Sequence, residues 1–309
     1  MRSVRTDLAL ESSALQNASG ALSGIRMTQR VYEDVVETIV DVLDERGAHA
    51  LGRAIGRYVT LASADMPLPD CQTRTVLVER LRLTLCGMLP ASGDVLVVGL
   101  GNRRVTADSL GPKVVDKMLV TRHMRDQMPP PLKGRLRSVS AVAPGVLGVT
   151  GMETAEVVRG IVENIRPAAV IAVDALAARE TARICTTLQI ADTGIDPGSG
   201  IGNHRMALNR ETLGVPVIAL GVPMVVYAAT IARDALSLLA GDLGFDCEEH
   251  ASALDALVSR VVAEQLGDMV VTPREVDERV QNIADAIALG VNRALQPQLS
   301  NDEFQVLTR

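Results

Sequence analysis

The sequence has no tryptophan, only two phenylalanines and three tyrosines among its 309 residues. Any core must therefore be built from Val, Ile, Leu, Ala and Met, which together with the other apolar types make up 47% of the chain. No run of about 18 uncharged apolar residues occurs, and the N-terminus lacks the apolar segment of a signal peptide. We expect an intracellular protein that does not enter a membrane.

Cysteine, histidine and clustered basic residues are also scarce. The four cysteines are far apart and form no CxxC motif, which favours reduced thiols over a disulfide framework. The four histidines occur at no metal-ligand spacing. The net charge is −6 and no Lys/Arg block stands out, so direct binding to nucleic acid is not expected.

The segment Asp94–Val115 combines a strand, a glycine-rich turn and a helix start. Val95–Val98 is a short β-branched run typical of a parallel strand that is buried on both faces. Leu110, Val114 and Met118 recur at helical spacing, so we expect a helix that runs to about Val120. Asp108 would lie near its N-terminus, where it could be an ordinary N-cap or part of a site.

A second apolar strand, Ala169–Val173, runs directly into Asp174. Ligands of open α/β sheets bind beyond the carboxyl ends of parallel strands. Asp108 and Asp174 would then meet at one edge of the sheet, and we take them together as a candidate catalytic pair.

Further strands and helices alternate along the chain, which predicts an α/β fold with a mostly parallel, doubly wound sheet and helices on both faces. The Thr272–Glu275 segment has the pattern of a capping box that opens a long helix to about Leu295. The expected strands include Ser138–Val142, Ile184–Ile190 and Val215–Leu220, and the expected helices include Thr75–Leu89 and Glu153–Ile165.

Ahead of this core we expect an N-terminal β layer over about residues 25–63, with an antiparallel pair in Ile25–Leu43 and a strand at Arg57–Ala62. The α/β core would cover about residues 74–240, and C-terminal helices about residues 249–295. Residues 8–309 would thus form a single α/β domain.

Six blocks, in this order, resemble the germination protease family of spore-forming bacteria. They are GLGNRRVTADSLGPKVV, TRH at Thr121–His123, APGVLGVTGMET, VDALAAR at Val173–Arg179, DTGIDPGSGIGN at Asp192–Asn203, and TLGVPVIALGVP. The resemblance extends from about Val4 to the C-terminus.

The resemblance implies a self-processing endopeptidase of atypical aspartic type that needs no cofactor. Its expected substrates are the small acid-soluble, DNA-protecting proteins of the spore, which it degrades during germination in the spore core. Its two proposed catalytic aspartates correspond to Asp108 and Asp174. The family also implies a homotetramer, and a fold of the phosphorylase/hydrolase type like that of the hydrogenase maturation proteases.

The N-terminal residues resemble the end of that family's propeptide. Thr6-Asp7-Leu8-Ala9 has the acidic, hydrophobic, Ala order of the cleavage sequence. The implied self-cleavage lies between Asp7 and Leu8, which would release residues 1–7 as a propeptide. Without the resemblance, the ordinary interpretation is a frayed terminus.

Other residues are candidates for assisting the two aspartates. If Asp108 and Asp174 approach closely, their repulsion would let the pair share one proton, so that one carboxylate activates water and the other polarises the carbonyl group. Backbone amides of the turn at Gly99, Gly101 and Asn102 could stabilise the oxyanion. A pocket for an acidic substrate residue calls for cations, and the arginines that flank the blocks are Arg122, Arg179 and Arg205.

Several alternatives remain open at this point. Asp192 or Asp196 could replace Asp174, and His123 or His204 could complete a metal site in a maturation-type protease on the same fold. Tyr227 stands where the family is expected to carry an acid. A binding protein that has lost catalysis is therefore the third possibility.

Overall fold

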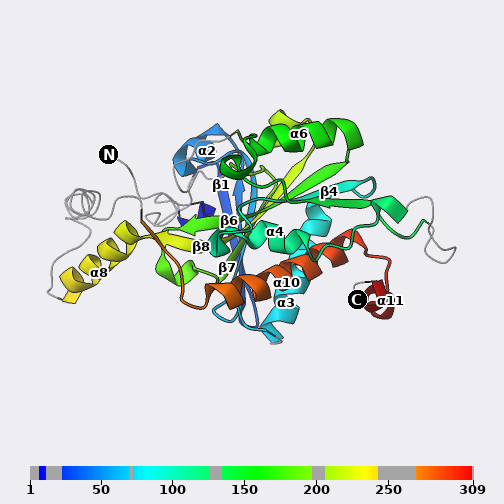
Figure 1. Cartoon of the computed structure of the whole chain (residues 1–309). Helices are drawn as coiled ribbons and strands as arrows, with labels where there is room; N and C mark the ends of the chain where they lie inside the picture. The colour runs from blue at the N-terminus through cyan, green and yellow to red at the C-terminus, as the bar shows by residue number, and fades with distance from the viewer. Residues whose placement is uncertain are drawn as a thin grey trace.

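The computed structural model describes residues 7–11, 23–69, 72–124, 134–196, 206–242 and 269–307. Within these residues, a sheet of nine strands forms the centre of the molecule and helices cover both of its faces (Figure 1). The strands are β1 (Ile25–Tyr32), β2 (Val35–Val42), β3 (Gly56–Ala62), β4 (Val95–Gly99), β5 (Val139–Val142), β6 (Ala169–Ala178), β7 (Thr187–Ala191), β8 (Val217–Tyr227) and β9 (Val270–Val271).

The strand order is β1-β2-β3-β7-β8-β6-β4-β5, and β9 pairs with β8. Strands β5, β4, β6 and β8 pair in parallel. The N-terminal strands continue the same sheet, because β3 pairs antiparallel with β7 and β7 pairs antiparallel with β8. The predicted α/β fold is confirmed, but the sheet is mixed and not mostly parallel, because the expected N-terminal β layer extends the same sheet with antiparallel strands.

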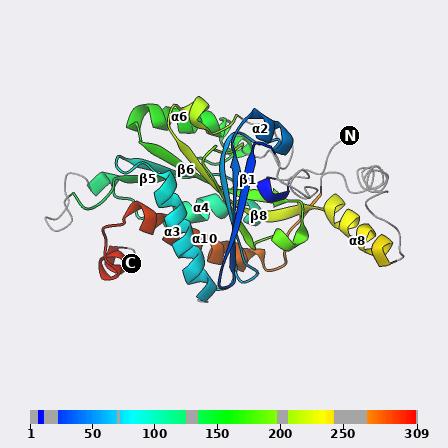
Figure 2. The same ribbon diagram turned by 180° about the vertical axis from the view of Figure 1, so that it is seen from behind.

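The parallel half is buried on both faces, as the apolar run in β4 predicts. Val95 and Val97 pack into a large core with α3 (Gln72–Met88), α4 (Leu110–Val115) and α10 (Val276–Leu295). Leu96 and Val98 point to the other face and pack with α6 (Thr154–Ile165). Figures 1 and 2 show α3 and α10 crossing one face of the sheet while α6 lies on the opposite face.

The shorter elements lie around these two layers. Helix α8 (Ala228–Asp242) projects away from the body of the molecule in both views (Figures 1 and 2). No helix among the described residues is long and apolar enough to span a membrane. The other helices are α2 (Glu45–Leu51), α5 (Leu147–Thr150), α7 (Arg210–Leu213), α11 (Asn301–Leu307) and the 3-10 turns η1 (Ala9–Glu11), η2 (Thr106–Asp108), η3 (Arg122–Met124) and η5 (Thr181–Arg183).

Most predicted elements are present, but several boundaries were wrong. The helix after Asp108 begins at Leu110 and ends at Val115. It stops early because the side chain of Asn292 on α10 accepts a hydrogen bond from Leu119 N–H (2.9 Å) and donates one to Lys117 O (3.0 Å). These two backbone groups thus bond to α10 and not within a longer helix.

The predicted bounds of two strands, β6 and β7, were also wrong. Strand β6 continues through Asp174 to Ala178, because β8 still pairs with it there. Cys185, which was expected in a strand, precedes β7 with a left-handed φ of 60° and is fully buried.

The predicted capping box at Thr272 is wrong. The Thr272 hydroxyl donates to Met224 O of β8 (2.9 Å) and caps no helix. Helix α10 begins at Val276, and its N-cap residue Glu275 makes no side-chain capping bond. Of the expected C-terminal helices, residues 249–268 lie outside the described part of the chain.

Candidate active site

Asp108 enters the site from the turn between β4 and α4. It closes the 3-10 turn η2, and its Oδ2 accepts a hydrogen bond from Asn102 N–H (2.8 Å). Gly101 has a φ of +105°, and a Cβ there would lie 2.1 Å from the carbonyl oxygen of Asp108. Only glycine lets the turn pass this close to Asp108. The N-cap position of α4 is occupied by Ser109, so Asp108 does not hold the capping role considered for it.

Asp174 lies where β6 loses one of its two neighbours. Strand β4 pairs with β6 only as far as Val173, whereas β8 continues, with Asp174 opposite Gly221. Asp174 is 6% exposed, and its Oδ1 accepts a hydrogen bond from Ala175 N–H (2.9 Å). Its side chain therefore opens onto the space beyond the end of β4.

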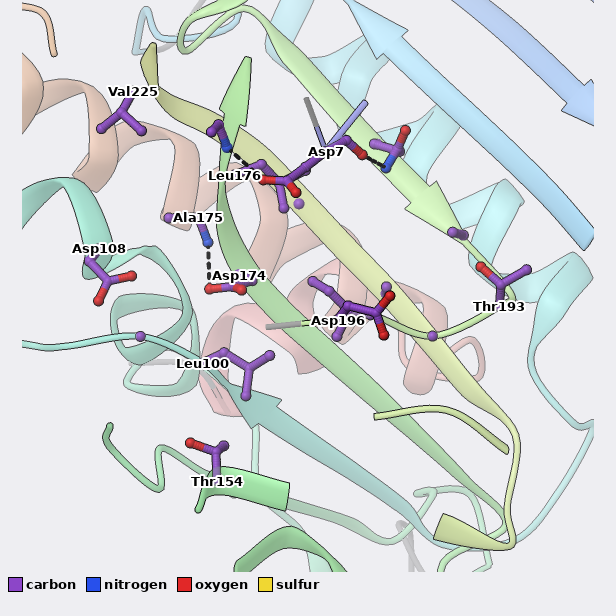
Figure 3. Close-up of a pocket in the computed structure, with 18 of the residues that line it drawn as sticks. Asp7, Leu100, Asp108, Thr154, Asp174, Ala175, Leu176, Thr193, Asp196 and Val225 are labelled. Carbon is purple, nitrogen blue, oxygen red and sulfur yellow. Dashed lines mark hydrogen bonds between the residues drawn. The ribbon is translucent and has the colours of Figure 1, made fainter. Parts of the chain in front are cut away.

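Asp108 and Asp174 line the same pocket, which has a volume of about 420 Å³. Figure 3 shows both carboxylates around this cavity, together with Asp7 and Asp196. The remaining polar lining includes Arg53, Tyr58, Thr154, Thr193, Gln189 and Asn209. The structure thus brings the two predicted aspartates to one cavity.

The N-terminal segment is seated in this pocket. Asp7 N–H donates to Ala177 O (3.2 Å), and Asp7 Oδ2 accepts from Ala177 N–H (2.9 Å), on the part of β6 that extends past β4. The side-chain amide of Gln189 donates to Asp7 O (3.1 Å), and dashed lines at Asp7 in Figure 3 mark these side-chain contacts. Leu8 is fully buried against Leu176 and the end of β8.

Glu11 anchors the other end of this segment. Its carboxylate is buried and accepts hydrogen bonds from the backbone N–H groups of Arg179 and Glu180, both at 2.8 Å. The guanidinium Nε of Arg183 lies 3.4 Å from its Oε1. A buried carboxylate needs such partners, so residues 7–11 are held at both ends.

The other predicted site residues are placed as follows. Gly99 ends β4, where a Cβ would lie 2.2 Å from Gly111 O, so its role is close packing against α4. The Asn102 amide donates to Asp108 and is thereby committed away from an oxyanion. Arg122 is exposed on η3 and is not among the described residues that line the pocket. Arg179 contributes its backbone N–H to Glu11, and Arg205 lies outside the described residues.

The alternative carboxylates differ from each other. Asp192 is exposed, and its Oδ1 accepts from Arg57 N–H on β3 (2.7 Å), whereas Asp196 lines the pocket. Tyr227 ends β8 opposite Val270 and is half-buried.

The metal alternative calls for three or more ligating side chains around one point. No group of three or more His, Cys, Asp or Glu side chains within the described ranges is arranged to hold an ion. His123 is exposed on η3, and His204 falls in the part of the chain that is not described. The described part of the pocket thus offers carboxylates but no matching third ligand.

Two residues of the site were not predicted from the sequence. Gln189 lies between Leu188 and Ile190 in the buried strand β7, and the charged residue Glu11 is buried as well. A polar residue inside a buried run is the signal that could have identified Gln189. Glu11 gives no such signal, because its partners are backbone groups about 170 residues away.

Carboxylates around a pocket in which the N-terminal segment of the chain is seated define an α/β protein equipped to bind a polypeptide. The family model described as germination protease matches residues 4–263. The chain is 43% identical to the germination protease of Clostridium acetobutylicum over 98% of both chains, and 34% identical to that of Priestia megaterium over 99% of this chain and 97% of the other. The chain therefore belongs to the germination protease family and is a peptidase.

A solved structure was matched as well. It is the crystal structure of a NiFe hydrogenase maturation protease, HycI from Thermococcus kodakarensis, at 16% identity and a TM-score of 0.35. The match covers 66% of this chain and 96% of that one. At this TM-score the match carries no functional weight.

Proposed function

We propose that this peptidase is a self-processing endopeptidase that cuts its own chain between Asp7 and Leu8 and then degrades small acid-soluble spore proteins in the spore core. The reaction is hydrolysis by water held between Asp108 and Asp174. The cut follows an acidic residue and precedes a hydrophobic one.

The observation that carries this proposal is the seating of Asp7 in the pocket that Asp108 and Asp174 line. Hydrogen bonds to Ala177 and Gln189 fix the backbone on the N-terminal side of Leu8, and burial of Leu8 fixes the other side. Holding a reactant in place next to the reacting groups is a large part of enzymatic rate enhancement.

The pocket also accounts for an acidic residue before the cut. The carboxylate of Asp7 accepts a hydrogen bond from Ala177 N–H, and Arg53 lines the same cavity. In this proposal the backbone N–H of Ala177 binds the acidic side chain, a role that was expected of Arg122, Arg179 and Arg205. The apolar surroundings of Leu8, which include Leu176 and Val226, suit a hydrophobic residue after the cut.

The chemistry divides between the two aspartates. One carboxylate, charged, takes a proton from water as the water oxygen attacks the carbonyl carbon of Asp7, and the other, protonated, donates to the leaving nitrogen of Leu8. Two carboxylates at one site can share a single proton in this way. The products are a free carboxyl group on Asp7 and a free amine on Leu8.

The test is the intact mass of the purified chain after incubation in mildly acidic buffer, for the wild type, Asp108→Asn and Asp174→Asn. We expect the wild type to lose residues 1–7 and each variant to lose them about 10²–10⁴-fold more slowly, the usual contribution of a general acid or base. Because the segment sits in the pocket of its own chain, the rate should not depend on protein concentration. Asp192→Asn is the matched control and should cleave like the wild type.

Each other outcome identifies an alternative. Cleavage that stops with a chelator would favour a metal-dependent maturation-type protease. Unchanged cleavage in both Asp108→Asn and Asp174→Asn would contradict the aspartate pair. If no cleavage occurs and a chain that begins at Leu8 fails to cut a spore-protein peptide, the binding-protein alternative is supported.

We also propose a homotetramer, which the family resemblance implies. Strand β1 is the edge of the sheet and exposes Met27 (56%) and Val31 (67%). Light scattering should give four times the 32.8 kDa mass of the chain, and a monomer would contradict this assembly.

A further inference from the structure

Gln189 occupies an unusual position for a polar side chain. It lies in the middle of β7, between Leu188 and Ile190, which are fully buried in the main core. Because successive residues of a strand face opposite sides, Gln189 points away from that core and toward the pocket. The residue is 9% exposed, so its amide needs hydrogen-bond partners.

Both ends of this amide bind the N-terminal segment. Nε2 donates to Asp7 O (3.1 Å), and Oε1 accepts from Ala9 N–H (2.6 Å). These partners determine the orientation of the amide. Rotating it by 180° would place Oε1 against Asp7 O, two acceptors, and Nε2 against Ala9 N–H, two donors. The side chain of Gln189 is therefore hydrogen-bonded to the backbone on both sides of Leu8.

We propose that Gln189 is a catalytic residue that stabilises the oxyanion of the peptide-bond hydrolysis. This inference rests on the proposed cleavage between Asp7 and Leu8. Asp7 O is then the oxygen of the scissile carbonyl group. As water attacks, the carbonyl electron pair moves onto this oxygen, and Nε2 of Gln189 donates a hydrogen bond to the charge that develops there.

The hydrogen bond from Ala9 N–H to Gln189 Oε1 also fixes the position of the segment along its binding site. By accepting from Ala9 N–H, Oε1 fixes the residue two positions after Asp7 and so sets the register of the segment along β6. Gln189 contacts backbone atoms of the segment at both ends of its amide. The same two contacts are therefore available to any substrate backbone that adopts this conformation, whatever its side chains.

The test compares first-order rates of self-cleavage in the full chain for Gln189→Met and Gln189→Glu. Met has a similar length but neither donates nor accepts strongly, and an ionised Glu keeps the acceptor for Ala9 N–H but loses the donor. We expect both variants to cleave about 10²–10³-fold more slowly, the effect of removing one oxyanion donor. Gln281→Glu on α10, where the side chain contacts Lys113, is the matched control and should cleave like the wild type.

Two further readouts separate a catalytic role from a structural one. Gln189→Glu leaves a buried carboxylate oxygen against Asp7 O, so circular dichroism should first show that both variants fold, and amide exchange at Ala9 should then accelerate in Gln189→Met but not in Gln189→Glu. A stably folded Gln189→Met that cleaves at the wild-type rate overturns this proposal alone. A wild type that never loses residues 1–7 overturns the proposed self-cleavage as well.

Discussion

Backbone N–H groups donate hydrogen bonds to three carboxylates that line the pocket. Asp108 accepts from Asn102 N–H, Asp174 from Ala175 N–H and Asp7 from Ala177 N–H. Such groups cannot be moved by rotating a side chain, so each carboxylate is oriented by the path of the chain itself. Changes in the backbone near Asp108 should therefore affect the site as strongly as changes in side chains.

Gly101 gives a direct test at this scale. In Gly101→Ala the new Cβ would meet Asp108 O at 2.1 Å, in a backbone conformation that disfavours L-residues. We expect a loss of about 1–3 kcal/mol in the free energy of unfolding and slower self-cleavage, measured by denaturation and intact mass. Gly148→Ala, where nothing lies within 4 Å, should leave both unchanged or slightly raise stability. Equal behaviour of the two variants would contradict this account of the turn.

Cys185 should be unreactive. Burial raises its pKa to about 11, although Arg279 acts in the opposite direction. Only the thiolate is nucleophilic, so at pH 8 the reactive fraction should be about 100-fold below that of a thiol at the usual value near 9. Peptide mapping after iodoacetamide treatment of the folded protein should find Cys86, which is exposed, alkylated and Cys185 unmodified. Rapid labelling of Cys185 would show that the segment just before β7 opens readily.

At the scale of elements, Asn292 joins α10 to the segment that follows α4. The side chain is 3% exposed and bonds to two backbone groups, Leu119 N–H and Lys117 O. Asn292→Ala should lower the free energy of unfolding by about 1–3 kcal/mol, because both groups lose a partner. Urea denaturation with an unchanged m-value would measure this effect.

A second asparagine on α10 serves as the control for that variant. Asn282 is half-buried and donates one hydrogen bond, to Pro67 O (3.1 Å). Asn282→Ala should cost only about 0.5–1.5 kcal/mol. A larger loss for Asn282→Ala than for Asn292→Ala would contradict the proposed role of Asn292.

At the scale of the whole molecule, the N-terminal segment is part of the folded body. Leu8 and Ala9 are fully buried and Glu11 is bound at the end of β6. A chain that begins at Leu8 keeps these contacts but loses the hydrogen bonds of Asp7, so its unfolding temperature should lie between those of the full chain and of a chain that begins at Ser12. A chain that begins at Ser12 should be less stable by at least the burial of Leu8, about 1.5–3 kcal/mol. Equal melting temperatures by calorimetry would show that the segment adds no stability.

The amino-acid sequence alone predicts the alternation of strands and helices, the burial of β4 on both faces, and Asp108 and Asp174 at one edge of the parallel strands, although Asp174 lies within β6. These features depend on local apolar periodicity and on the rule that parallel strands end at one edge. The ends of the helices were less predictable, because they depend on distant partners. The side chain of Asn292 bonds to the backbone after α4, where the helix was expected to continue. The hydroxyl of Thr272, the expected cap, donates to Met224 O instead.

The completion of the site depends on contacts between segments that lie far apart in the sequence. The tertiary structure brought Asp7 between β6 and Gln189, from positions about 170–180 residues apart in the chain. It also enclosed Glu11 with two backbone amides and removed Asn102 from the list of oxyanion donors. Hydrogen bonds between backbone atoms and a remote side chain leave no periodic pattern in a sequence, so they become visible only when the chain is folded.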